Sequence, residues 1–104
     1  MSKSWFRAGC AVTLLAGAPI PAQAQDPNAA RALAATCTTC HGTDGRSVGG
    51  VPPSIAGQSK ASLYQQLLDF KSGKRPATIM HQHAKGYTDA QLEQIAGYFA
   101  SVKP

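Results

Sequence analysis

The segment ATCTTCHGTDG (35–45) carries two thiols three positions apart and a histidine directly after the second: Cys37, Cys40 and His41. Three chemistries use a C-x-x-C pair: a thioredoxin-like disulfide, half of a zinc site, and covalent attachment of a haem. The residue types and their spacing admit all three. The choice therefore depends on the rest of the sequence.

The disulfide and the zinc site lack the surroundings that each requires. A thioredoxin-like pair lies within a βαβ pattern, and no strand pattern precedes Cys37. A closed zinc site needs four ligands, and the histidines that could complete one, His81 and His83, are far along the chain. Haem attachment uses the whole C-x-x-C-H unit, because the thiols add to the porphyrin vinyl groups and the histidine reaches the iron. We therefore predict one covalent haem c held by Cys37 and Cys40, with His41 as an axial ligand.

We predict Met80 as the second axial ligand of that iron, because it is the only methionine besides Met1. We expect Met80 in an irregular stretch, where a loop can bring its sulfur over the iron; a core-filling methionine is the alternative. His81 and His83 are rival ligands, and a thioether raises the potential where a second histidine would lower it. With both axial positions filled, and no constellation of catalytic side chains elsewhere, outer-sphere electron transfer remains as the function.

Residues 1–24 predict a secretory signal peptide. Two basic residues precede an apolar run of eleven residues, and Ala-Gln-Ala follows as a cleavage site. The run is shorter than the roughly 20 residues of a membrane span, so we expect no membrane anchor in the mature form and a periplasmic location. Residues 25–104 are then the mature domain.

A single domain of this length has a marginal hydrophobic core, and small exported domains usually depend on a disulfide, metal or cofactor. Residues 25–104 contain only the two closely spaced cysteines, so a large prosthetic group is the stabilising element that fits. The same residues carry eight Lys or Arg against five Asp or Glu, without a basic run interleaved with aromatics. This argues against nucleic-acid binding and is compatible with an acidic protein partner.

Three helices and no strand are predicted, which makes the domain all-α. The first covers about 27–36, with an apolar side of Ala29, Ala30, Leu33 and Cys37; the second begins after Ser59 and ends near Gly73. The third, over 88–102, has a Thr88–Gln91 capping box and an apolar stripe of Leu92, Ile95, Ala96 and Phe99. A glycine inside that helix, Gly97, suggests a close crossing with the first helix.

Four segments of the mature chain resemble class I c-type cytochromes: CTTCHG, VPPSIAGQ, TIM and LEQIAGYF. The resemblance covers residues 25–104. It implies a cytochrome c-like fold of three to four helices around one covalent haem, with terminal helices that cross near Gly97 and Tyr98. It also implies that the loop containing Pro53 supplies a backbone carbonyl to the His41 ring, which would tune the iron.

A narrower similarity links FKSG, TIM and AKGYTDAQLEQIAGYF to the haem subunit of flavocytochrome c sulfide dehydrogenase. It implies that the chain accepts electrons from a sulfide-oxidising flavoprotein, so that any enzymatic activity belongs to the complex. Some members have two haem domains, whereas this sequence has one C-x-x-C-H. The alternative is a free soluble carrier between respiratory or photosynthetic complexes. A gas-binding or peroxide-active haem protein is a third class, against which Met80 argues.

The two leading functions predict different surfaces. A permanent subunit should present an apolar patch, for which Val51, Ile55 and Ile79 are candidates. A free carrier should rely on charge, and the basic residues at the end of the second helix (Lys71, Lys74 and Arg75) could steer encounters. The redox potential and the oligomeric state are left open by the sequence.

Overall fold

The structure is a computed structural model that describes Gly17 and residues 26–104. It contains α1 (Pro27–His41), the 3-10 turn η1 (Thr43–Gly45), α2 (Lys60–Ser72), α3 (Met80–Lys85) and α4 (Asp89–Ser101). Over this described part there is no strand, so the all-α prediction is confirmed. None of the helices found there has the length and apolarity needed to cross a bilayer. The expected signal peptide lies outside the described residues apart from Gly17.

Helix α1 begins as predicted and ends later than predicted. The Asp26 carboxylate accepts a hydrogen bond from the Asn28 amide at 2.9 Å, and Pro27 occupies the first helical position. The helix does not stop near residue 36 but continues through the C-x-x-C-H unit to Gly42, whose φ of 84° ends it. No residue before that glycine breaks a helix, and the spacing of the two thiols suits one.

The predicted ends of the next helices are confirmed. The Ser59 hydroxyl caps α2 by accepting from the Ser62 amide, and Gly73 closes the helix in the left-handed conformation. At α4, the Thr88 hydroxyl accepts from the Gln91 amide while the Gln91 side chain accepts from the Thr88 amide. This is the reciprocal capping box that the sequence predicted.

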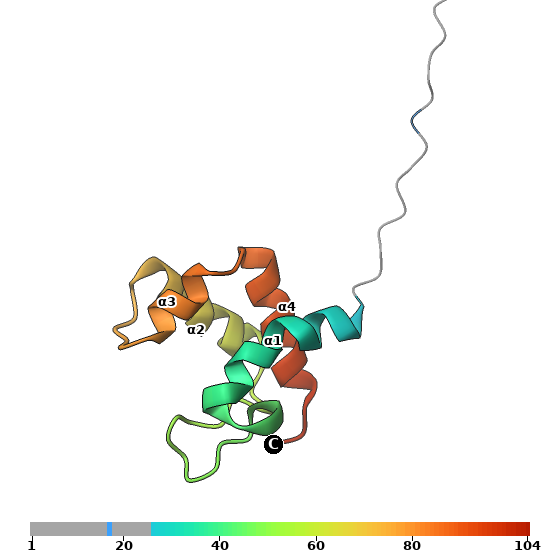
Figure 1. The fold of residues 1–104 in the computed structure, drawn as a ribbon. Coiled ribbons are helices and arrows are strands. Elements are labelled where there is room, and N and C mark those ends of the chain that lie inside the picture. Colours follow the sequence, from blue (N-terminus) through green and yellow to red (C-terminus); the bar gives the residue numbers. More distant parts are fainter. Residues whose placement is uncertain (1–16, 18–25) are drawn as a thin grey trace, which may run out of the picture.

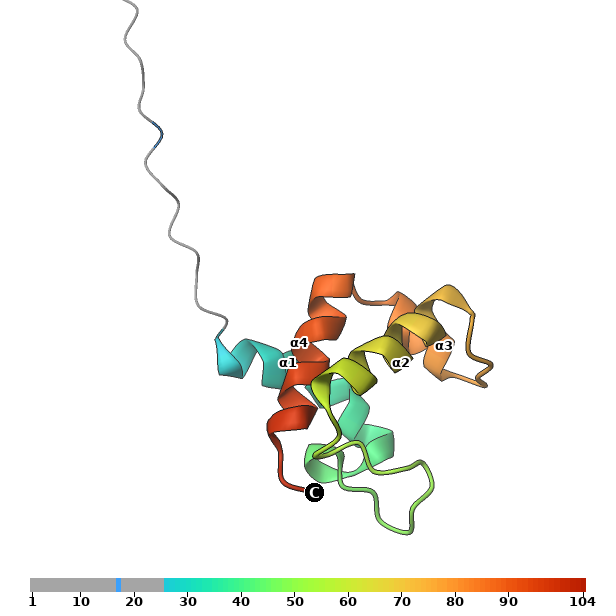
Figure 2. The ribbon, with the colours of Figure 1, turned by 180° about the vertical axis from the view of Figure 1, so that it is seen from behind.

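Helix α4 supplies most of the hydrophobic core. All four residues of its predicted stripe are buried, and they pack with Ala34 of α1 and Leu63 of α2. The predicted apolar side of α1 is only partly right, since Ala29 is exposed whereas Ala34 is fully buried. Figures 1 and 2 show α4 running through the centre of the molecule, with α1 and α2 against it.

The start of α4 is tied to both neighbouring helices. The Tyr87 hydroxyl lies 2.7 Å from the Thr36 hydroxyl of α1, and the Tyr87 carbonyl accepts a hydrogen bond from Lys71 of α2 at 2.9 Å. The same ammonium group pairs with Asp89 at 2.7 Å. These contacts fix the orientation of α4 where it enters the core.

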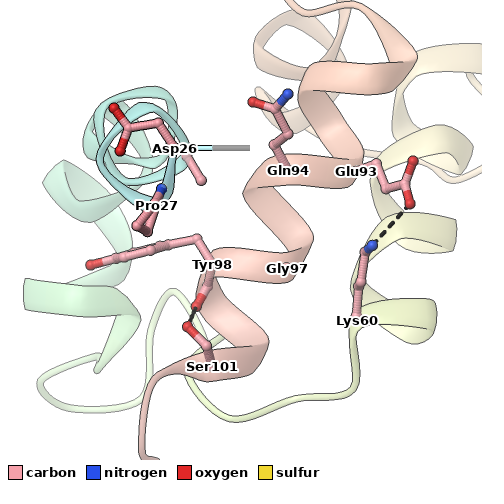
Figure 3. A pocket seen from close by; sticks show the side chains of 9 residues that line it. Asp26, Pro27, Lys60, Glu93, Gln94, Gly97, Tyr98 and Ser101 are labelled. Carbon is pink, nitrogen blue, oxygen red and sulfur yellow. Dashed lines mark hydrogen bonds and ion pairs between the residues drawn. The ribbon is translucent and has the colours of Figure 1, made fainter. Parts of the chain in front are cut away.

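The prediction that Gly97 permits a close crossing with α1 is wrong. A methyl group built at Gly97 would contact only the Lys60 side chain, at 3.7 Å from its Cε atom. Figure 3 shows why: a cavity of about 200 Å³ lies over this glycine, between the start of α1 and Lys60. Helices α1 and α4 do pack together, but no atom of α1 lies within 4 Å of the position that a methyl group at Gly97 would take.

Candidate functional site

The last turns of α1 carry the two thiols and the histidine. Cys37 is half-buried against the core and Cys40 is exposed, and their spacing of three residues places them on one side of the helix. No disulfide joins them. Burial raises the pKa of the Cys37 thiol above its usual range. His41 is only 9% exposed, at the point where α1 ends.

The imidazole of His41 is held in one tautomer by the loop that faces it. Its Nδ1 atom lies 2.7 Å from the backbone carbonyl oxygen of Pro53. A carbonyl can only accept, so Nδ1 carries the hydrogen of this bond, and Nε2 is the ring nitrogen left to serve as a ligand. The hydrogen bond that the resemblance implied for this loop is present in the structure. Its effect is to orient the imidazole so that Nε2 is the nitrogen available as a ligand.

The loop that contains Pro53 is closed on itself by backbone contacts. The Gly45 carbonyl accepts from the amides of Ile55 at 2.8 Å and Ala56 at 3.1 Å. Gly45 has a φ of 79°, and a methyl group built there would lie 2.8 Å from atoms of Ile55 and Phe99. A side chain at this position would therefore push the two arms of the loop apart.

The same loop is bound to the C-terminal end of α4. The Tyr98 hydroxyl donates to the Asp44 carboxylate at 2.8 Å, Arg46 donates to the Lys103 carbonyl at 2.9 Å, and the Gly57 amide donates to the Phe99 carbonyl at 2.8 Å. The hydrogen bond to Asp44 is the main reason that the pKa of Tyr98 is raised. Sequence reasoning missed this set of contacts, because the residues are separated by more than forty positions and show no local pattern.

Met80 lies on a different element from the other candidate residues. It is half-buried and is the first residue of α3, which packs against α2. The expectation of an irregular stretch is wrong here: residues 80–85 form a short helix, which begins shortly after Pro76 and ends at Gly86. The structure thus brings Cys37, Cys40, His41 and Pro53 together, and the role of Met80 as an axial ligand stays a prediction.

The two rival histidines differ in burial. His83 is exposed. His81 is half-buried, and its Nδ1 atom is covered by protein atoms without a hydrogen-bond partner among the described residues.

The predicted apolar surface patch is confirmed for two of its three residues. Val51 is 86% exposed and Ile79 is 53% exposed, as expected, and Val48, which sequence reasoning missed, is 93% exposed. Ile55 does not belong to this surface, because it packs against the core. Val48 and Val51 flank two glycines in the irregular segment between η1 and α2, which projects from the helices in Figure 1.

The basic residues near the end of α2 already have partners. Lys71 pairs with Asp89, and Lys74 lies 3.9 Å from the Asp69 carboxylate. Arg75 donates to the Gln66 side chain and stacks over the Phe70 ring. Their charges are partly compensated within the molecule, which weakens the case for long-range steering.

The donor set fits a covalent haem better than a closed metal site. Over residues 26–104, no group of three or more His, Cys, Asp or Glu side chains is arranged to hold a metal ion. Two thiols outside any disulfide, beside an imidazole whose Nδ1 is already bonded to a carbonyl, are what a porphyrin with two vinyl groups and an iron requires.

Comparison with known proteins identifies the family. The cytochrome c family model matches residues 28–103. The chain is 47% identical over 70 residues to the cytochrome subunit of sulfide dehydrogenase from Chlorobaculum tepidum, a match that covers 67% of this chain and 63% of that protein. It is 42% identical over 80 residues to cytochrome c4 from Pseudomonas aeruginosa, covering 77% and 40% of the two chains. The chain therefore spans less than two thirds of the length of these two relatives.

Two further matches extend this comparison. The chain is 35% identical over 69 residues to cytochrome c-554(548) from Halomonas halodenitrificans, covering 64% of this chain and 83% of that protein. The solved structure of cytochrome c4 from Acidithiobacillus ferrooxidans matches with a TM-score of 0.59 and 43% identity, over 64% of this chain and 38% of that one. This chain thus belongs to the cytochrome c family, as an electron carrier whose cofactor is covalently bound haem c.

Proposed function

We propose that this chain is a periplasmic monohaem cytochrome that passes single electrons as the haem subunit of a sulfide-oxidising flavoprotein. The observation that carries the electron-transfer part is the 2.7 Å contact between His41 Nδ1 and the Pro53 carbonyl. It leaves Nε2 as the only ring nitrogen able to ligate iron, beside two thiols placed for thioether bonds.

The roles of the residues follow from this arrangement. Cys37 and Cys40 hold the porphyrin, His41 Nε2 is one axial ligand, and the Met80 thioether is the other. Haem c, when bound, supplies an iron that gains and loses one electron. The chain contributes orientation, since the Pro53 carbonyl fixes the imidazole, and exclusion of water, since His41 is nearly buried.

The periplasmic location is proposed from the first 24 residues. Their basic start, short apolar run and Ala-Gln-Ala sequence have the form of a cleavable export signal. Residues 25–104 would then act outside the cytoplasm.

The flavoprotein partner is supported by similarity and by the surface. The relative that is 47% identical is the cytochrome subunit of a sulfide dehydrogenase. The exposed side chains of Val48, Val51 and Ile79 offer apolar area for a stable contact, while the lysines that could attract a partner over a distance are paired. These features favour a lasting complex over brief charge-steered encounters.

A free soluble carrier is the second candidate, and one observation favours it. The match to the Halomonas cytochrome covers 83% of that protein, so a relative of nearly this size exists without a large additional domain. In that case the partners would be other redox proteins met one at a time.

The deciding experiment is native purification from the host's periplasm, followed by absorption spectra across the chromatographic peak. We expect haem and flavin bands at a constant ratio, with reduction of the haem on addition of sulfide. Haem alone in the peak, at low salt and without detergent, would refute the permanent subunit and support the free carrier.

The Met80 assignment has its own test. Met80→Ala should let the ferrous protein bind carbon monoxide, which the unmodified protein should not do. His83→Ala, on the same short helix but exposed, is the matched control and should stay closed to carbon monoxide. If His81→Ala opens the iron and Met80→Ala does not, the second ligand is His81.

A further inference from the structure

The acceptor that fixes His41 lies in a segment that cannot anchor itself by its own amides. Pro52 and Pro53 are consecutive, and proline has no backbone N–H. The position of the Pro53 carbonyl must therefore be set by the residues on either side of the two prolines. Pro53 is also exposed, so packing around its ring contributes little.

Ser54 is the residue that shares a peptide group with this carbonyl. Because the peptide group is planar, the Pro53 carbonyl lies in one plane with the Ser54 nitrogen and Cα, so contacts that hold Ser54 restrict the direction of that carbonyl. Two contacts hold Ser54: its hydroxyl accepts from the Ser47 amide at 2.8 Å, and its own carbonyl accepts from the Gln58 side-chain amide at 2.8 Å. One contact spans the loop, and the other reaches back from the segment before α2.

The hydrogen bonds of the three residues that follow Ser54 are between backbone atoms. The amides of Ile55 and Ala56 donate to the Gly45 carbonyl, and the Gly57 amide donates to the Phe99 carbonyl. These bonds hold the base of the loop on α4. The serine hydroxyl and the glutamine amide are the side-chain contacts that act directly on Ser54, next to the acceptor.

We propose that Ser54 and Gln58 are positioning residues that aim the Pro53 carbonyl at His41 Nδ1 and thereby set the electron-donor strength of the imidazole. This inference rests on the proposed function, in which His41 is an axial ligand. A well-aimed acceptor on Nδ1 makes Nε2 a stronger donor, and a stronger donor favours ferric over ferrous iron. Loss of either side-chain contact should therefore weaken the Nδ1 hydrogen bond and raise the reduction potential.

The test uses the intact haem protein with Ser54→Ala and Gln58→Ala. Ser72→Ala and Gln65→Ala are matched controls, because these residues make similar side-chain hydrogen bonds within α2, away from the loop. The reduction potential of each variant is measured, and the His41 Nδ1 proton is followed by NMR in the ferrous protein labelled with ¹⁵N-histidine. In both loop variants we expect a higher potential, a shifted Nδ1 proton and exchange of that proton about fivefold faster, the factor that one net hydrogen bond gives.

Two further comparisons separate positioning from general destabilisation. Ser54→Thr keeps a hydroxyl and should restore the wild-type potential and proton shift, even if its urea midpoint differs. The controls should leave both readouts unchanged whatever their stability.

The proposal is overturned if Ser54→Ala and Gln58→Ala keep the wild-type potential and proton shift, or if the controls change them equally. Failure of the proposed function would look different. In that case the His41 signals of the wild-type protein would not respond to oxidation of the iron, which would overturn both.

Discussion

The hydroxyl of Tyr98 donates a hydrogen bond to the carboxylate of Asp44 at 2.8 Å, across 54 positions of the chain. Asp44 has a φ of 52°, in the left-handed region that residues other than glycine rarely adopt. Its other carboxylate oxygen lies 3.7 Å from Arg46. The tyrosine thus holds an uncommon backbone conformation in the turn that follows His41.

Replacing Tyr98 by phenylalanine should lower the free energy of unfolding by about 1 kcal/mol at neutral pH, the usual net value of one hydrogen bond. The effect should depend on pH in a defined direction. The folded protein raises the pKa of Tyr98, mainly through the bond to Asp44. This stabilisation is therefore complete below pH ~10, the pKa of an unfolded tyrosine, and is lost as the pH rises through the folded value.

Urea unfolding at pH 7 and above pH ~10 tests this prediction. The difference between wild type and Tyr98→Phe should shrink at the higher pH. Tyr64→Phe is a suitable control, because no hydrogen bond of the Tyr64 hydroxyl is found among the residues described by the structure. A difference that is constant with pH would contradict the assignment.

Two glycine substitutions should change the free energy of unfolding in opposite directions. Gly97→Ala should raise stability by up to about 1 kcal/mol, because the new methyl group meets only the flexible Lys60 side chain and alanine favours the helix. Gly45→Ala should cost about 2 kcal/mol or more, because φ is 79° and the methyl group would lie 2.8 Å from Ile55 and Phe99. Thermal unfolding of both variants is the measurement. Destabilisation by Gly97→Ala would restore the idea of a close crossing with α1.

Replacing apolar side chains by alanine should cost far more stability at buried positions than at exposed ones. Leu92 is completely buried, so Leu92→Ala should cost about 2–5 kcal/mol through lost contacts and the cavity that remains. Val48 is 93% exposed, and Val48→Ala should change stability by less than about 0.5 kcal/mol. Chemical denaturation of the haem-loaded protein gives both values. Equal losses of stability in the two variants would contradict the position of α4 in the core.

The two lysines near the end of α2 should contribute unequally. Lys71→Met removes the donor to the Tyr87 carbonyl and the partner of Asp89, and should cost about 1–2 kcal/mol. Lys74 has a side chain that is 76% exposed and a 3.9 Å ion pair, so Lys74→Met should cost less than about 0.5 kcal/mol. Denaturant midpoints of the two variants are the measurement. An equal loss of stability in both would mean that the contacts of Lys71 with the Tyr87 carbonyl and Asp89 do not stabilise the fold.

Sequence patterns predicted those features that are local. The stripe of α4 emerged because Leu92, Ile95 and Phe99 recur at helical spacing, and the caps at Ser59 and Thr88 emerged because a cap depends on residues within one turn. The C-x-x-C-H unit was readable for the same reason, since its chemistry depends on neighbours along the chain.

Features set by distant neighbours were not predictable in this way. Whether Ile55 faced solvent or the core depended on Phe99 and Gly45, and the environment of Gly97 depended on where Lys60 lies. The short helix beginning at Met80 was missed because six residues give too little periodicity to recognise. The importance of Ser54 and Gln58 follows only from the contacts of the folded loop.

The late position of α4 in the chain has a consequence for biosynthesis. Its four buried residues complete the core, so the earlier residues have little to pack against until α4 has been made. We expect the nascent chain to stay open during synthesis, with the thiols of Cys37 and Cys40 accessible for attachment of the cofactor. Burial of Cys37 would then follow attachment instead of obstructing it.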